Sequence, residues 1–88
     1  MKSKEGGRLE YVVYMLRCAD GTLYTGITTD LKRRVAVHNS GKGAKYTRGR
    51  GPLELVYAQI CSDKSEALKR ELEIKALKRE QKRKLIGI

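Results

Sequence analysis

An arginine and a histidine lie where a short helix should bury its apolar side chains. The segment YTGITTDLKRRVAVHN, residues 24–39, predicts the end of a strand, a cap and a helix that begins just after Asp30. At about 100° per residue, one narrow face of this helix carries Leu31, Arg34, Val35 and His38. Arginine binds oxyanions and histidine exchanges a proton near neutral pH, so this face carries two groups that could do chemistry.

A second helix shows the same mixture of apolar and charged residues on one face. The segment SEALKRELEIKALK turns one broad apolar face toward the core, made of Ala67, Leu68, Leu72 and Ile74. Glu71 and Lys75 fall inside this arc rather than on the charged side. The simpler explanation is an ordinary i,i+4 pair between them, worth roughly 0.2–0.5 kcal/mol.

The register of the first predicted hairpin decides whether two tyrosines can act together. A two-residue loop at Asp20-Gly21 would put Tyr14 and Tyr24 on opposite faces of the sheet. A three-residue loop, closed by a glycine in the left-handed region, puts both phenols on one face with Gly26 opposite Tyr14. We favour the second register, because a missing side chain at Gly26 leaves room for a close approach.

Each of these features has a structural explanation when it is taken alone. His38 could be a packed or surface histidine, Arg34 could extend to water along its aliphatic stem, and the tyrosines could simply fill the core. However, two helices and a hairpin present polar groups toward the same sheet. This convergence favours a functional site.

Composition limits the class of protein and of partner. The chain has 88 residues, which we interpret as a single domain over 1–88. It has no Phe and no Trp, so its core must be thin, and its formal net charge is +10. Such a charge favours an anionic partner, with nucleic acid ahead of an acidic membrane surface.

Several other classes are disfavoured. No apolar run approaches the roughly 20 residues that cross a bilayer, and the basic start of the chain is not followed by a signal-peptide segment. With one histidine and only Cys18 and Cys61, a zinc site is improbable and two reduced, packed thiols are expected. We therefore expect a cytoplasmic protein that neither enters membranes nor carries a small-molecule cofactor.

The remaining pattern predicts an α+β chain in the order β-β-α-β-α-α. Strands are expected over 10–17, 22–28 and 53–61, and a helix of about 14 residues should follow a cap at Ser62-Asp63 and end near Lys78. The basic stretch LKREQKRKLI should continue this helix or form a last one.

The segment between the first helix and the third strand predicts a mobile basic loop. It lacks the glycine and lysine spacing of a nucleotide-binding P-loop. Its side chains could grip a nucleic-acid backbone and stack on bases, and the candidates are Lys42, Lys45, Tyr46, Arg48 and Arg50. A merely solvated, flexible loop is the alternative.

Taken in order, these motifs resemble those of the GIY-YIG nuclease superfamily. The motifs are Val12-Val13-Tyr14, Tyr24-Thr25-Gly26, the Arg34 and His38 pair, and Ala67-Leu68-Lys69-Arg70-Glu71. The resemblance spans residues 10 to about 84 and is greatest to small stand-alone bacterial members. It implies a three-stranded antiparallel sheet flanked by helices, one divalent metal ion and hydrolysis of a phosphodiester.

The resemblance also implies a role for each residue. Tyr14 and Tyr24 match the motif tyrosines, with Tyr14 the first candidate for water activation and Tyr24 the second. Arg34 would bind a phosphate oxygen, and His38 matches the histidine that often follows it. Glu71 would hold Mg²⁺ or Mn²⁺. A tyrosine pKa of about 10 would have to be lowered, and the metal and Arg34 could do this.

The chain also departs from the family pattern. Val12, Val13 and Thr25 replace name-giving residues, which leaves Tyr14, Tyr24 and Gly26 of the two motifs. Larger relatives add a DNA-reading domain for which this chain has no length, so specificity would need another source, such as a protein partner.

Two functions from different classes fit this sequence. The first is a metal-dependent endonuclease on DNA, structure-selective or related to repair. The second is a nucleic-acid-binding or ribosome-associated module on the same scaffold. Retention of all five polar residues favours the nuclease, because binding alone does not need Glu71. We expect the five to line one concavity and Arg33 to face solvent.

Overall fold

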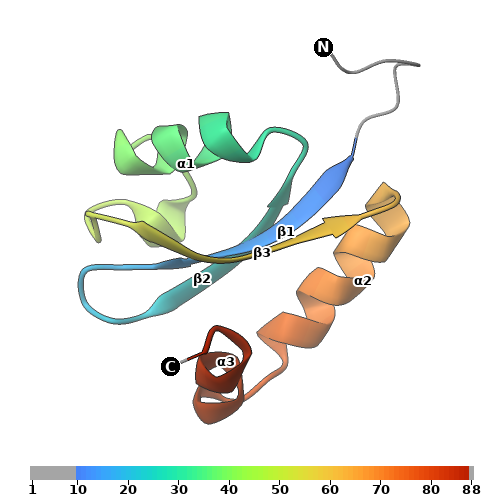
Figure 1. Ribbon diagram of the computed structural model, residues 1–88. Helices are drawn as coiled ribbons and strands as arrows, with labels where there is room; N and C mark the ends of the chain where they lie inside the picture. Colours follow the sequence, from blue (N-terminus) through green and yellow to red (C-terminus); the bar gives the residue numbers. More distant parts are fainter. Residues whose placement is uncertain (1–9, 88) are drawn as a thin grey trace.

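A single antiparallel sheet separates the helices into two layers (Figure 1). The computed structural model describes residues 10–87. The strand order is β2-β1-β3, with β1 (Tyr11–Arg17) in the centre and β2 (Leu23–Thr28) and β3 (Glu54–Cys61) at the edges. The helical elements are α1 (Leu31–Asn39), the short 3₁₀ helix η2 (Lys45–Thr47), α2 (Lys64–Lys75) and α3 (Arg79–Leu85). The predicted α+β fold and order of elements are confirmed.

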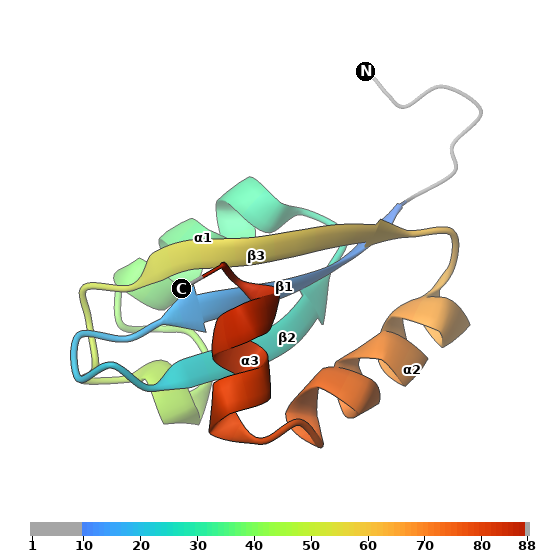
Figure 2. The ribbon, with the colours of Figure 1, turned by 60° about the horizontal axis from the view of Figure 1, so that its bottom comes forward.

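The two faces of the sheet bury different side chains. Toward α1, one cluster contains Tyr14, Leu16, Cys18 and Leu53, with Tyr24, Leu31 and Val35 packed against it. Toward α2, a second cluster contains Val13, Met15, Cys61, Ala67 and Ile74. Leu85 and Ile86 join this second cluster, which holds α3 across the strands as Figure 2 shows. Both cysteines are free and buried, as expected.

The β1–β2 hairpin has the register that places both tyrosines on one face. Tyr14 pairs with Gly26 and Leu16 pairs with Tyr24. The turn is closed by hydrogen bonds from Cys18 N to Thr22 O (2.8 Å) and from Gly21 N to Cys18 O (2.9 Å). Gly21 has φ +86°, the left-handed conformation that this three-residue loop requires of its last residue.

Aspartates begin the two longer helices. Asp30 Oδ1 accepts a hydrogen bond from Arg33 N at 3.2 Å, and Asp63 Oδ1 accepts one from Glu66 N at 2.8 Å. Each carboxylate satisfies an amide that has no partner within the helix. Asp30 thereby fixes where α1 starts, and with it the positions of Arg34 and His38.

The buried stripe of α2 differs from the predicted one. Ala67 and Ile74 are fully buried, but Leu68 and Leu72 are 41% and 68% exposed, so the predicted burial of these two leucines is wrong. The helix packs instead through the face of Ala67 and Ile74, and beside this face Arg70 Nε donates to Gln59 Oε1 of β3 at 3.0 Å.

The predicted mobile loop is instead bonded to the rest of the fold along its length. Its 3₁₀ helix η2 carries the buried Thr47, and Ala19 N donates to Arg50 O at 2.8 Å. At its far end, the Asn39 side chain accepts from Leu53 N at 2.9 Å. Within residues 10–87, no helix is long and apolar enough to cross a membrane.

The packing of α2 gives a direct test of its orientation. Ile74→Ala should lower the free energy of unfolding by about 2–5 kcal/mol, because it removes a fully buried side chain and leaves a cavity. Leu72→Ala should change it by no more than about 0.5 kcal/mol. Urea unfolding of both variants measures this, and equal losses would mean that α2 packs through a different face.

Candidate active site

A buried hydrogen bond joins β1 to α1. Tyr14 Oη lies 2.9 Å from His38 Nε2, and the two residues are only 1% and 2% exposed. Tyr14 is in the middle of the central strand, and His38 is in the last turn of α1. The periodicity that put His38 on the inner face of the helix therefore predicted its position correctly.

A chain of hydrogen bonds defines which nitrogen of His38 carries the proton. Thr47 Oγ1 donates to Ala44 O at 2.9 Å, so it must accept from His38 Nδ1, which also lies 2.9 Å away. In the neutral ring Nε2 then has no proton, and it accepts the hydrogen bond of the Tyr14 hydroxyl. The imidazole is thus oriented as a proton acceptor for Tyr14.

The electrostatics of the pair keep both members neutral near pH 7. Burial, reinforced by neighbouring Tyr24, raises the pKa of Tyr14 to about 12, although the Arg34 guanidinium acts in the opposite direction. Burial and the charge of Arg34 lower the pKa of His38. Arg34 therefore lowers the pKa of Tyr14 as expected, but burial outweighs its effect.

Tyr24 connects this buried pair to the surface. Its ring centroid lies 6.3 Å from that of Tyr14 and 5.2 Å from that of His38. On its other side Tyr46 stacks at 5.9 Å, with an angle of 27° between the rings. Tyr24 also lines an open cavity of about 390 Å³, together with Leu23, Thr25, Tyr46, Lys75 and Lys82.

Two glycines let backbone approach the aromatic cluster closely. A Cβ at Gly26 would lie 2.7 Å from Tyr14 Oη and 3.1 Å from Tyr24 Cε2. A Cβ at Gly43 would overlap His38 Nδ1 and lie 2.8 Å from its Cα. Gly26 therefore leaves room for the Tyr14 phenol, as its motif position predicted. Gly43 allows the loop to close over His38, which sequence reasoning missed.

Arg34 is exposed rather than buried. It lines a second cavity of about 360 Å³ at the start of α1, whose lining includes Thr28, Thr29, Asp30, Arg33 and Val37. Arg33 is exposed as expected but shares this cavity, so the two arginines do not point to opposite sides. Both guanidinium groups are open to an anion from solvent.

Glu71 lies on the other side of the sheet from the Tyr14–His38 pair. It is in α2, on the flank opposite the Arg70 contact with β3 and therefore toward β2. Its carboxylate is 16% exposed and 3.1 Å from Lys75 Nζ. Lys75 itself lines the cavity beside Tyr24, which connects Glu71 to the same edge of β2.

The five predicted site residues lie at different depths in the structure. Tyr14 and His38 are almost fully buried, and the loop that contains Gly43 and Thr47 lies against His38. Tyr24 and Arg34 line two different cavities, but both lie close enough to the Tyr14 hydroxyl to change its pKa, and Glu71 is connected to the first cavity by its ion pair with Lys75. The site is a buried proton-exchanging pair with separate surface groups around it.

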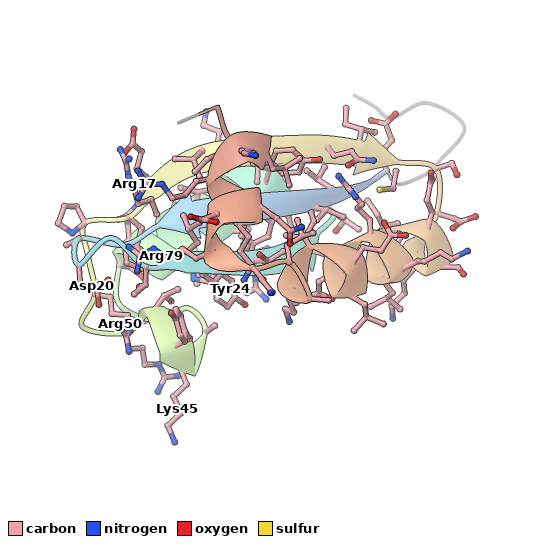
Figure 3. All side chains as sticks on the ribbon, turned by 90° about the horizontal axis from the view of Figure 1, so that it is seen from below. Arg17, Asp20, Tyr24, Lys45, Arg50 and Arg79 are labelled. Atoms are coloured by element: carbon pink, nitrogen blue, oxygen red, sulfur yellow. The ribbon has the colours of Figure 1, made fainter. Side chains whose placement is uncertain are left out.

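The basic loop contributes both structural and exposed groups. Arg50 Nη1 contacts Asp20 Oδ2 at 2.6 Å, and Figure 3 labels both residues. The Arg50 guanidinium lies 4.6 Å from the centroid of the Tyr46 ring. Arg48 Nε donates to Gly43 O at 3.3 Å. Lys42 and Lys45 remain exposed. The predicted binding residues Tyr46, Arg48 and Arg50 thus also hold the loop in place.

A divalent ion fits Glu71 only through a single protein carboxylate. The described residues contain no group of three or more His, Cys, Asp or Glu side chains that could enclose a metal. Mg²⁺ retains several waters and is commonly held by one or two carboxylates plus substrate phosphate. A partly buried carboxylate paired with one half-exposed lysine fits this mode of binding.

Comparison with known proteins identifies the family to which this chain belongs. A family model for the GIY-YIG catalytic domain matches residues 10–84, and the chain therefore belongs to the GIY-YIG family.

Several similar proteins carry the name UPF0213. One from Staphylococcus haemolyticus is 53% identical over 77 residues, covering 88% of this chain and 94% of that protein. Another, from Natronomonas pharaonis, is 56% identical over 78 residues, covering 89% and 92%. The solution structure of a UPF0213 protein from Bacillus halodurans has 51% identity and a TM-score of 0.60, covering 90% of this chain and 84% of its own.

The buried His38 predicts a specific pH dependence of stability. Because folding lowers the pKa of His38, the unfolded chain binds its proton first as the pH falls below about 6.5. The free energy of unfolding should therefore decrease between pH 7 and pH 5 by more in the wild type than in His38→Gln. Denaturant unfolding at several pH values measures this difference, in which the carboxylates common to both proteins cancel. Parallel profiles would contradict a buried neutral imidazole.

The close approach at Gly43 predicts a second effect on stability. Gly43→Ala should lower the free energy of unfolding by about 1–3 kcal/mol, because the new methyl group overlaps a ring that has no space to move. Gly51→Ala is the matched control, since a Cβ there meets nothing within 4 Å and its φ is ordinary. Thermal and urea unfolding measure both; an unaffected Gly43→Ala would mean that the loop is not closed on His38.

Proposed function

We propose that the protein is a divalent-metal-dependent endonuclease that hydrolyses phosphodiester bonds in DNA. The observation that carries this proposal is the Tyr14–His38 hydrogen bond, in which a neutral imidazole is oriented to accept the phenolic proton beside Arg34. A module that only binds nucleic acid needs positive charge but not a buried proton acceptor. Membership of the GIY-YIG catalytic domain family supports the same reaction class.

The raised pKa of Tyr14 determines the order of proton transfer. A phenol with a pKa of about 12 is not ionised beforehand, so it must release one proton as it takes another. Tyr24 is the phenol that lines an open cavity, and its ring, 6.3 Å from that of Tyr14, contributes to the raised pKa of Tyr14. Tyr24 takes a proton from the attacking water, its own proton passes to Tyr14, and the Tyr14 proton passes to His38 Nε2.

The hydroxide formed in this way attacks phosphorus. The bond from phosphorus to the leaving oxygen breaks, and that oxygen takes a proton from solvent. Arg34 binds a non-bridging phosphate oxygen and stabilises the charge that grows on it in the transition state. Glu71 would hold one Mg²⁺ or Mn²⁺ ion, whose chemistry is Lewis-acid stabilisation of the phosphate and leaving oxygen.

The proposal also covers the cellular location of the protein and the source of its substrate specificity. Two buried free thiols suit a reducing compartment, which supports a cytoplasmic protein. Structure-selective or repair-related cleavage, guided by a protein partner, completes the proposal.

Replacement of Glu71 separates catalysis from binding. In Glu71→Gln, cleavage in Mg²⁺ or Mn²⁺ should fall by at least about 10²-fold, which corresponds to a few kcal/mol of lost transition-state stabilisation. Affinity for DNA in EDTA should stay nearly constant. The matched control is Glu73→Gln on the same helix, whose carboxylate is exposed and paired with Arg70 at 3.3 Å; it should cut like the wild type.

The cleavage assay uses branched, nicked and single-stranded DNA as substrates, and RNA is tested in parallel. A wild type that binds these substrates and cuts none would indicate the binding or ribosome-associated module instead. Equal residual cutting by wild type and Glu71→Gln would indicate a contaminating nuclease and would leave Glu71 as the ordinary salt-bridge partner of Lys75.

A further inference from the structure

A continuous groove follows the edge of β2 between α3 and η2. Three cavities of about 390, 210 and 160 Å³ succeed one another there, and Leu23 lines all three. Tyr46 and Lys82 are shared by the first two cavities, and Gly21 and Arg79 by the second and third. One end of the groove lies at Tyr24, so it leads directly to the exposed phenol of the site.

Positive side chains line this groove from end to end. They are Lys75, Lys82, Arg79, Arg83 and Arg17, taken from the Tyr24 end outward. Within residues 10–87, Arg79, Lys82 and Arg83 form no ion pair, whereas Lys75 pairs with Glu71 and Arg17 with Glu54. Arg79 and Lys82, both in α3, line the middle cavity together with Tyr46. Three charges are therefore available to a polyanion.

The floor of the groove is apolar. Leu23 runs beneath all three cavities, and the Tyr24 and Tyr46 rings form the wall at the inner end. Tyr46 is 43% exposed, although it stacks on Tyr24 and the Arg50 guanidinium lies over its ring. A duplex presents only phosphates along such a surface, whereas a single strand presents phosphates to the cations and base faces to the apolar floor.

We propose that this groove binds one single strand of nucleic acid and leads it to Tyr24. This inference deepens the proposed function, because it assigns unpaired strands or unpaired flanks as the substrate class. The part that leads the strand to Tyr24 rests on the proposed function. The α3 cations that carry it were not among the binding residues predicted from sequence, which all lie in the loop between α1 and β3.

The test is binding of a labelled oligothymidylate in EDTA, followed by fluorescence anisotropy. The double variant Arg79→Ala/Lys82→Ala should bind about tenfold more weakly at low salt. Its slope of log affinity against log salt should be smaller by about 1.4, which is about 0.7 for each of two lost phosphate contacts. The matched control Lys64→Ala/Lys69→Ala removes two exposed charges from α2 outside the groove and should bind like the wild type.

Binding of a duplex with the same number of phosphates decides whether the groove binds single-stranded or double-stranded nucleic acid. The wild type should prefer the single strand, and Arg79→Ala/Lys82→Ala should lose that preference while unfolding at nearly the wild-type temperature. Equal weakening in both double variants, or equal or tighter binding of the duplex by the wild type, would overturn the proposal. Because EDTA excludes cleavage, a protein that binds in this way and cuts nothing would refute the nuclease but not the groove.

Discussion

The hydrogen bond between Tyr14 and His38 is the constraint on which this site depends. Both groups are almost fully buried, and leaving either one without a hydrogen-bond partner would destabilise the folded state. The bond fixes the last turn of α1 over the central strand, and Thr47 on the second nitrogen of His38 fixes the loop over both. Positions 26 and 43 require glycine for the same reason, because a side chain at either position would collide with one member of the pair.

Local rules were sufficient to predict the fold and the inner part of the site. Asp30 and Asp63 begin helices where capping chemistry puts them, and the three-residue hairpin loop decides the face on which Tyr14 and Tyr24 lie. Helical periodicity was sufficient to predict that His38 faces the sheet, because Leu31 and Val35 on the same helix face do pack toward the sheet. These features depend on residues that are close in sequence.

The features that were not predicted depend on contacts between distant segments. Leu68 and Leu72 are exposed because α2 packs on the sheet through Ala67 and Ile74, and a helical wheel does not contain such contacts with the sheet. The loop after α1 is rich in glycine and lysine, which is typical of mobile segments, yet Thr47 and Arg50 attach it to His38 and Asp20. The cations of α3 line a groove only because Leu85 and Ile86 anchor that helix across the sheet.

The hydrogen-bond chain beyond His38 also limits where a proton can go. Thr47 donates its only proton to the carbonyl oxygen of Ala44, and a peptide carbonyl does not accept and pass on a proton at neutral pH. The hydrogen-bond chain therefore ends at Ala44 and does not conduct protons through the protein. A proton that reaches the imidazole is stored there and must return through the Tyr14 hydroxyl, so the pair can hold one proton and must be emptied before it can accept another.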